Sequence, residues 1–156
     1  MNDKLEHLRE AMSRFKTAML VTHDAEQGLQ ARPLEIADCS PEGRLSFFTA
    51  CDSGKVAQIQ RDASVAVVMQ DRRRFVSVSG SARFDSSLER RRQLWRESFR
   101  PWFPQGPDDP NAVALEVIPV SAELWDLSGK SGLEYRIHTL TALVSGKRAS
   151  DRSDTG

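Results

Sequence analysis

Three consecutive residues, Ser53, Gly54 and Lys55, combine side chains that suit the binding of a phosphate group. They follow a strand-like segment that ends at Thr49 and open a predicted helix over residues 53–61. The first N–H groups of a helix lack partners within the helix and lie at the positive end of its dipole, so they can bind an anion. A hydroxyl, a residue without a side chain and a lysine cation complete the pattern. It predicts a site for a terminal phosphate, although serine is also simply a good helix N-cap and a lysine in the first turn is commonly solvated.

A second candidate for anion binding, Arg32, lies on a predicted strand over residues 30–38. In an alternating strand Arg32 shares a face with Leu34 and Ile36. A guanidinium among apolar side chains requires an anionic partner, unless that face is open to solvent. Pro33 cannot donate to a sheet ladder, so its position must face an edge, a bulge or a ligand.

Motifs for other kinds of chemistry are absent from the sequence. It contains no G-x-x-x-x-G-K-[ST], no G-x-G-x-x-G and no G-x-S-x-G. The histidines His7, His23 and His138 are scattered, without the spacing of metal ligands. Cys39 and Cys51 show neither metal-ligand nor C-x-x-C spacing. We therefore predict free thiols and no metal site, and these patterns leave any catalytic residue unknown.

The composition is that of an ordinary globular domain. The 156 residues carry 22 basic and 22 acidic side chains, for a formal net charge of zero. This balance disfavours a nucleic-acid partner, and the arginine runs 72–74 and 90–92 are interpreted as solvated faces. No apolar run is long enough to span a bilayer, and the charged first ten residues do not resemble a secretory signal. We expect a cytoplasmic protein without a membrane partner.

Strand-like segments outnumber helices and follow no regular βαβ order. Helices are predicted over 3–15, over 53–61, and from a capping box at Ser86 and Glu89 through about Phe99. Strands are predicted over 17–22, 30–38, 44–50, 65–70, 75–84, 112–117, 123–126 and 134–144, with Pro119 separating the sixth from the seventh. The pattern indicates a mainly β fold, a largely antiparallel barrel or sandwich with peripheral helices. One domain is expected over 1–144, followed by a polar, disordered tail over 145–156.

Together, these segments resemble the pyridoxamine-5′-phosphate oxidase-like FMN-binding split barrels, closest to their bacterial general stress protein branch. The resemblance runs from the first helix to about Trp125. It is carried by AMLVT, ARPLE, FFTACDSGKVAQIQRDASVAVV, FVSVSGSARF and VIPVSAELWD. It implies a six-stranded antiparallel split barrel with short helices that forms a homodimer, with FMN bound in clefts at the subunit interface.

The resemblance also implies which residues contact the phosphate of FMN. Arg32 matches a strand arginine that meets this phosphate. Ser53 and Lys55 match residues that grip it at the start of a short helix, and Gly54 between them permits close approach of the backbone.

Five further residues match positions beside the flavin ring. Pro33 and Leu34 would present their backbone to the isoalloxazine ring, Phe48 and Thr49 match a pair on the third strand, and Trp125 matches a tryptophan that approaches the ring.

The chain departs from true pyridoxamine phosphate oxidases at several positions. Ala37 stands near the place of a second basic residue, Gly54 stands where an arginine is usual, and Phe75 replaces a glutamine that bonds the flavin. The basic motif for the vitamin's phosphate is not recognisable in SGKSGLEYRIHTL. The resemblance therefore implies FMN binding but not oxidation of vitamin B6.

Two classes of function remain open beside an FMN-dependent oxidoreductase in which the flavin performs the redox chemistry. One is a flavin-binding stress protein without turnover, acting as a buffer or sensor. The other is a split barrel that uses a deazaflavin or haem, which the Ser53 and Lys55 pattern disfavours because it suits FMN directly.

Overall fold

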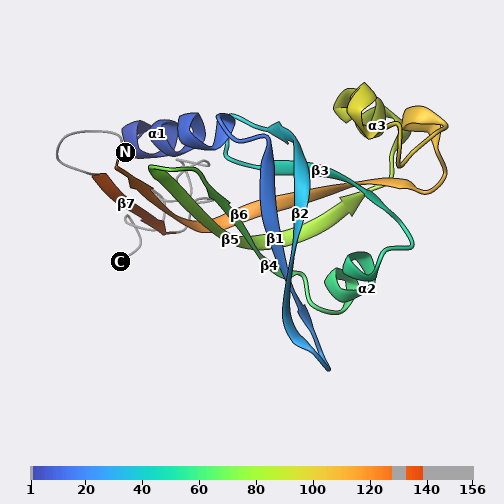
Figure 1. The fold of residues 1–156 in the computed structure, drawn as a ribbon, viewed down its shortest axis with the longest axis horizontal. Helices are drawn as coiled ribbons and strands as arrows, with labels where there is room; N and C mark the ends of the chain where they lie inside the picture. Colours follow the sequence, from blue (N-terminus) through green and yellow to red (C-terminus); the bar gives the residue numbers. More distant parts are fainter. Residues whose placement is uncertain (1, 128–132, 139–156) are drawn as a thin grey trace, which may run out of the picture.

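The computed structural model describes residues 2–127 and 133–138, which form one sheet, three α-helices and two 3-10 turns (Figure 1). In chain order the elements are α1 (Asn2–Ser13), β1 (Thr17–Asp24), β2 (Gly28–Cys39), β3 (Leu45–Ala50), α2 (Gly54–Arg61), β4 (Ser64–Gln70), β5 (Arg74–Asp85), α3 (Leu88–Leu94), η1 (Glu97–Phe99), η2 (Gly106–Asp108), β6 (Ala112–Asp126) and β7 (Leu133–His138). The predicted final strand is present as β7. Residues 139–144 of that prediction and the 145–156 tail lie outside the described residues.

Six antiparallel strands close into a barrel in the order β3-β2-β1-β4-β5-β6. The closing contact is a second pairing of β3, with β6, in which Thr49 lies opposite Val113. β7 adds to the free edge of β6 outside this ring. The prediction of a mainly β, six-stranded antiparallel barrel with short helices is confirmed.

The barrel core consists of residues that alternate along the strands. It is filled by fully buried side chains such as Leu20, Phe47, Val67, Val78 and Leu115. The helix α1 lies over the sheet and adds Leu8 and Met12 to the same core, as their helical spacing predicts (Figure 1). Burial of these side chains is the main source of the barrel's stability.

The strand β6 runs unbroken through Pro119, so the prediction that Pro119 separates two strands is wrong. The register between β5 and β6 shifts between Ser79 and Gly80, which places Gly80 opposite Pro119. A Cβ at Gly80 would run into the carbonyl oxygen of Ile118. The glycine and the bulge together let the proline remain in the strand.

The helix α3 begins one residue later and ends earlier than predicted. Its N-cap is Ser87, whose Oγ accepts from the backbone N–H of Arg90 at 3.2 Å. The side chain of Asp85 accepts from the N–H of Ser87 at 2.9 Å, and this turn carries the chain past the expected cap at Ser86. The helix ends at Leu94, because the chain turns to pack Phe99 against the barrel.

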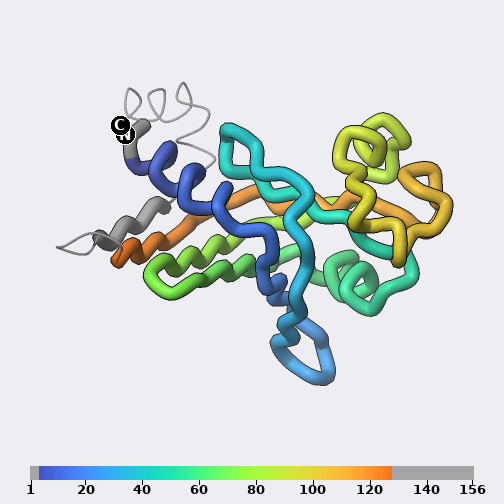
Figure 2. The backbone as a smooth tube through the Cα atoms, turned by 45° about the horizontal axis from the view of Figure 1, so that its top comes forward, coloured from blue at the N-terminus to red at the C-terminus, as the bar shows by residue number. Residues whose placement is uncertain are grey.

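A second hydrophobic cluster packs α3, η1 and η2 on the outside of β3. Phe47 points into the barrel, so its neighbour Phe48 points out. The ring of Phe48 stacks on Phe99 at 5.3 Å between centroids and meets Phe103 edge-on at 5.3 Å. Figure 2 shows the α3–η1–η2 segment at the same end of the molecule as α2. The cluster thus attaches a layer of helices beside the start of α2.

A buried carboxylate, Glu116 on β6, anchors α3 to the barrel. Its Oε1 accepts from Arg90 at 2.9 Å, and its Oε2 accepts from Arg83 at 3.2 Å and lies 3.8 Å from Arg44. Arg90 also donates to Ser46 at 2.9 Å. The interpretation of residues 90–92 as a solvated face is therefore wrong for Arg90, whose charge is paired in the structure.

The contact at Gly80 leads to a test of the bulge. We expect Gly80→Ala to lower the free energy of unfolding by about 1–3 kcal/mol, because the added methyl group forces the two strands apart. Urea denaturation measures this change. The matched control is Gly54→Ala, where an added Cβ meets nothing within 4 Å. Equal stability of the two variants would contradict the account of the bulge.

Candidate functional site

The split in the barrel lies between β2 and β3. The two strands pair from Cys39 opposite Leu45 to Ile36 opposite Phe47, and the pairing stops there, although both strands continue. Beyond this point β2 pairs only with β1. The edges by which β2 and β3 face each other are therefore unpaired at the residues that follow, while β2 stays paired with β1 and β3 with β6 on their other edges. This confirms that Pro33 lies at an edge of the ladder.

Four of the predicted residues lie on the two strand segments that border the split. Pro33 and Leu34 belong to the part of β2 that has lost its pairing with β3, and Phe48 and Thr49 belong to the corresponding part of β3. The side chain of Phe48 packs within the second hydrophobic cluster. Thr49 is buried, and its hydroxyl accepts a hydrogen bond from Lys55 Nζ at 2.8 Å.

Two cations, Arg32 and Lys55, approach each other beside the split without a carboxylate between them. Burial lowers the pKa of Lys55, and the nearby charge of Arg32 lowers it further. Burial also lowers the pKa of Arg32. In the described part of the chain, neither cation has an acidic partner. Two half-buried like charges of this kind form a site that favours an anion.

A third predicted residue, Ser53, lies two positions before Lys55 at the start of α2. Ser53 is the N-cap of α2 with extended backbone angles, φ −73° and ψ 152°, but its side chain makes no capping hydrogen bond. Its Oγ is buried and finds no hydrogen-bond partner within residues 2–127 and 133–138. A buried hydroxyl without a partner is costly, so the geometry favours a ligand-binding role over the alternative of a simple N-cap. We call Arg32, Ser53 and Lys55 the anion cradle.

Two residues outside the predicted set of cofactor-binding residues, Thr22 and Gln58, orient Arg32. The guanidinium donates to Thr22 Oγ1 at 2.6 Å and to Gln58 Oε1 at 3.1 Å. The amide Nε2 of Gln58 donates in turn to Asp24 at 3.2 Å and to Gln30 at 2.8 Å. A neutral amide thus stands between the guanidinium and the carboxylate of Asp24, which leaves the charge of Arg32 available to a ligand.

The signal for Gln58 was present in the sequence as spacing. Gln58 follows Lys55 by three residues, and residues at that spacing lie on one face of a helix. Thr22 gave no such signal, because a threonine at the end of an apolar strand segment is common. Its contact with Arg32 depends on the pairing of β1 with β2, which places Thr22 opposite Gln30, two residues before Arg32.

Trp125 is the one predicted site residue that lies far from the others. It is half-buried near the end of β6, where it pairs with Phe75, whereas Thr49 pairs with Val113 near the start of that strand. Because a strand rises about 3.3 Å per residue, Trp125 lies roughly 35–40 Å along β6 from Val113. Trp125 therefore cannot reach the anion cradle of the same chain.

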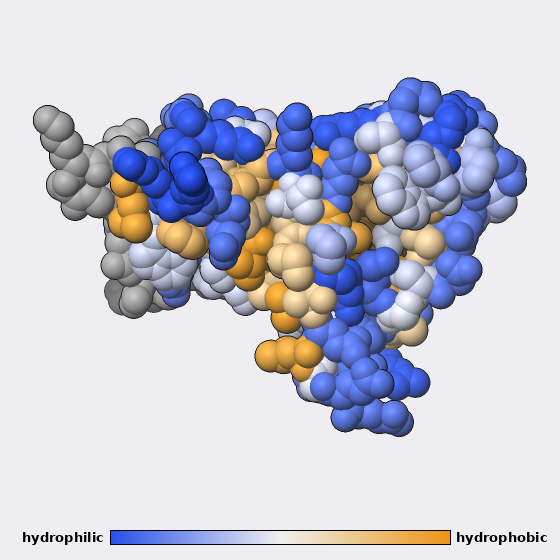
Figure 3. All heavy atoms as spheres, in the orientation of Figure 1, coloured by the Kyte–Doolittle hydropathy of each residue, from blue (hydrophilic) through white to orange (hydrophobic). Residues whose placement is uncertain are grey.

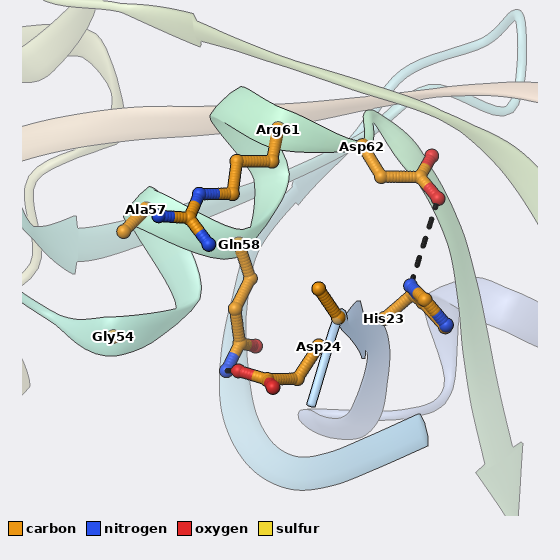
Figure 4. A pocket seen from close by; sticks show the side chains of 8 residues that line it. His23, Asp24, Gly54, Ala57, Gln58, Arg61 and Asp62 are labelled. Atoms are coloured by element: carbon orange, nitrogen blue, oxygen red, sulfur yellow. Dashed lines mark hydrogen bonds and ion pairs between the residues drawn. The ribbon is translucent and has the colours of Figure 1, made fainter. Parts of the chain in front are cut away.

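A pocket of about 400 Å³ adjoins the cradle on the side of α2 that faces the end of the β1–β2 hairpin (Figure 4). Gly54 and Gln58 from α2 and His23 and Asp24 from β1 are among its lining residues. The imidazole Nδ1 of His23 lies 4.0 Å from a carboxylate oxygen of Asp62 across the mouth. Figure 4 also shows the amide of Gln58 beside Asp24.

Known proteins share sequence and fold with this chain. The model of the family described as pyridoxamine 5′-phosphate oxidase like matches residues 3–150. The chain belongs to this family. It is 32% identical to general stress protein 26 of Bacillus subtilis over 63 residues, which cover 40% of this chain and 44% of that protein. The chain thus matches less than half the length of that curated relative.

Solved structures show the same fold. A protein related to general stress protein 26 from Clostridium acetobutylicum superposes with a TM-score of 0.73 at 14% identity, covering 88% of this chain and 96% of that one. The general stress FMN/FAD binding protein from Xanthomonas citri gives a TM-score of 0.71 at 26% identity, covering 83% of this chain and 93% of its own. The fold is the split barrel of this family, and the likenesses are to its general stress protein 26 branch.

Residues 2–127 and 133–138 contain neither a metal-ligand cluster nor a membrane-spanning helix. Among these residues, no three His, Cys, Asp or Glu side chains are grouped so that they could hold a metal ion. No helix within the same ranges is long and apolar enough to cross a membrane.

The approach of the two cations predicts a coupling between them. We expect Arg32→Gln to raise the pKa of Lys55 toward its ordinary value, because one of the two causes of its depression is removed. NMR titration of the lysine ε-carbon resonance in the ligand-free protein measures this pKa. Arg61→Gln, which removes a cation of the same helix outside the cradle, serves as the control. An unchanged pKa in Arg32→Gln would show that the two charges do not interact.

Proposed function

We propose that this protein binds FMN in the split between β2 and β3, and that it works as an FMN-dependent oxidoreductase. The observation that carries the proposal is the anion cradle: two half-buried cations with no acidic partner among the described residues, and a buried hydroxyl with no hydrogen-bond partner among them. A phosphate dianion supplies the negative charge and the acceptor oxygens that such a site requires. FMN-binding relatives of the same fold support this choice of ligand.

The chain's own residues bind and orient the cofactor. Arg32 and Lys55 neutralise the phosphate, and Ser53 donates its unpaired hydroxyl. Thr22 and Gln58 hold the guanidinium of Arg32 in place, so that its charge meets the phosphate without rearrangement. The open backbone edge at Pro33 and Leu34 borders the split and offers peptide groups to the ring.

FMN would supply the redox chemistry when bound, and the protein would supply position and electrostatics. Such a division of labour requires no general acid or base among the side chains. It therefore agrees with a site built from cations and backbone edges.

A homodimer would complete the site. Trp125 cannot reach the cradle of its own subunit, so a role beside the flavin requires the Trp125 of a second copy. The hairpin of β1 and β2 offers a surface for that copy: Met19 is 39% exposed and Leu29 is 74% exposed. Figure 3 shows apolar side chains gathered over these strands and toward the end of the hairpin. Apolar side chains of this kind are typical of the core of a protein interface.

The phosphate contact predicts a selective loss of affinity. Lys55→Ala should weaken FMN about tenfold or more, because one charge-assisted contact to the phosphate is lost. Riboflavin, which has the same ring without the phosphate, should bind as before. Isothermal titration of the apoprotein with each flavin measures both constants. Equal losses for the two flavins would contradict the assignment of Lys55 to the phosphate.

The shared site predicts complementation between two defective variants. Lys55→Ala and Trp125→Ala should each bind FMN weakly. If a site takes Lys55 from one subunit and Trp125 from the other, mixing the variants creates heterodimers with one intact site. Random pairing at equal amounts then restores tight binding to about one quarter of the sites. Titration of the re-equilibrated mixture counts these sites, and sedimentation verifies that it is dimeric. No recovery would contradict the shared site.

A turnover assay distinguishes an oxidoreductase from a flavin-binding protein that has no catalytic activity. The FMN-loaded protein should lose the visible absorbance of its flavin when a nicotinamide donor is added without oxygen, and regain it with oxygen or a quinone. If no donor bleaches the bound flavin, the protein is a flavin buffer or sensor, and the oxidoreductase proposal fails while FMN binding stands.

A further inference from the structure

The side chain of Gln58 makes four hydrogen bonds, which use every donor and acceptor position of its amide. Its Oε1 accepts from Thr22 Oγ1 at 2.6 Å and from Arg32 at 3.1 Å. Its Nε2 donates to Asp24 at 3.2 Å and to Gln30 at 2.8 Å. An amide offers two donor hydrogens and two acceptor lone pairs. The amide of Gln58 therefore has only one orientation in which all four contacts are made.

Charged groups on the two sides of Gln58 fix that orientation. The guanidinium of Arg32 can only donate, and an ionised carboxylate at Asp24 can only accept. If the amide of Gln58 turned over, its nitrogen would face Arg32 and its oxygen would face Asp24, so that two hydrogen bonds would become repulsive contacts. Figure 4 shows the amide of Gln58 directed at Asp24, with its nitrogen on that side.

Asp24 is itself held by the turn of the β1–β2 hairpin. Its Oδ1 accepts from the backbone N–H groups of Glu26 at 2.8 Å and Gln27 at 2.9 Å, which leaves Oδ2 to meet Gln58. The N–H groups of Gln27 and Glu26 also lower the pKa of Asp24, and the nearby charge of Arg61 acts in the same direction. The carboxylate therefore stays ionised at neutral pH, and the turn fixes its position.

We propose that Asp24 is a positioning residue for the anion cradle: through Gln58 it fixes the direction in which the guanidinium of Arg32 is held, and so makes the site selective for a flavin that carries a phosphate. This proposal rests on the proposed function, because the selectivity is for the phosphate of FMN. Asp24 acts from beyond the amide, so it orients Arg32 without pairing with its charge. A carboxylate in direct contact with Arg32 would instead compete with the phosphate for that charge.

The substitution Asp24→Asn tests this role while it keeps the turn. The oxygen of the introduced amide can still accept from the N–H groups of Glu26 and Gln27, so its NH2 group faces the NH2 group of Gln58. To avoid two opposed donors, the amide of Gln58 turns over and displaces Arg32. We expect FMN to bind about tenfold more weakly, the scale of one charge-assisted contact, and riboflavin to bind as before. Calorimetric titration of the apoprotein with each flavin measures both constants.

The matched control is Asp62→Asn. Asp62 lines the same pocket as Asp24, and its Oδ1 likewise accepts from a backbone N–H, that of Ser64 at 3.0 Å. Within the described ranges, no hydrogen bond joins Asp62 to Gln58. The control removes the same charge from the same pocket, and we expect it to change the affinity for neither flavin.

A paired exchange, Asp24→Asn with Gln58→Glu, tests where the carboxylate must lie. The pair still consists of one carboxylate and one amide, and the introduced asparagine can donate to the introduced glutamate, but the carboxylate now contacts Arg32. We expect a melting temperature no lower than that of Asp24→Asn alone, measured by circular dichroism. FMN should bind at least about tenfold more weakly than to the wild type, and riboflavin should bind as before.

Three outcomes would overturn the inference: Asp24→Asn and Asp62→Asn acting alike, Asp24→Asn weakening both flavins equally, or the paired exchange binding FMN as tightly as the wild type. In each of these outcomes FMN still binds the wild type, so the proposed function stands. Failure of FMN to bind the wild type would instead overturn the proposed function and this inference with it.

Discussion

The proximity of Arg32 and Lys55 is the constraint on which the site depends. Two cations that are partly removed from water and lack an acidic partner destabilise the folded chain. The stability of the barrel must offset the repulsion between the two cations. An anion that binds between them reduces this repulsion and stabilises the folded protein. Gln58 makes this arrangement possible, because its neutral amide satisfies the guanidinium of Arg32 and the carboxylate of Asp24 without pairing their charges.

The split between β2 and β3 determines where those charges lie. Pairing of the two strands ends at Ile36, next to a shift in their register. At this point Arg96 donates to the carbonyl oxygens of Ile36 and Ala37, at 3.2 and 2.9 Å. The contact ties the segment after α3 to the bulge of β2. The helical layer outside the barrel therefore helps to position the strand that carries Arg32.

Much of this arrangement could be predicted from the sequence, because it depends on local pattern. Alternating apolar residues indicated the strands, and the run from Ser53 to Lys55 indicated an anion site at the start of a helix. Long-range register could not be predicted in the same way. Pro119 remains within a strand only because Gly80 lies opposite it, and Trp125 lies far from the cradle only because β6 is continuous. The ion pair between Arg90 and Glu116 likewise joins segments that no local pattern connects.

The most direct test of the account is the ionisation of the FMN phosphate in the bound state. The second pKa of a free phosphate monoester is about 6. Phosphorus NMR of FMN bound to the protein, titrated with acid, reports this ionisation independently of affinity. If Arg32, Ser53 and Lys55 hold the phosphate, its second pKa is clearly lower in bound FMN than in free FMN, because the cations favour the dianion. A bound phosphate that titrates like the free cofactor would contradict the anion cradle.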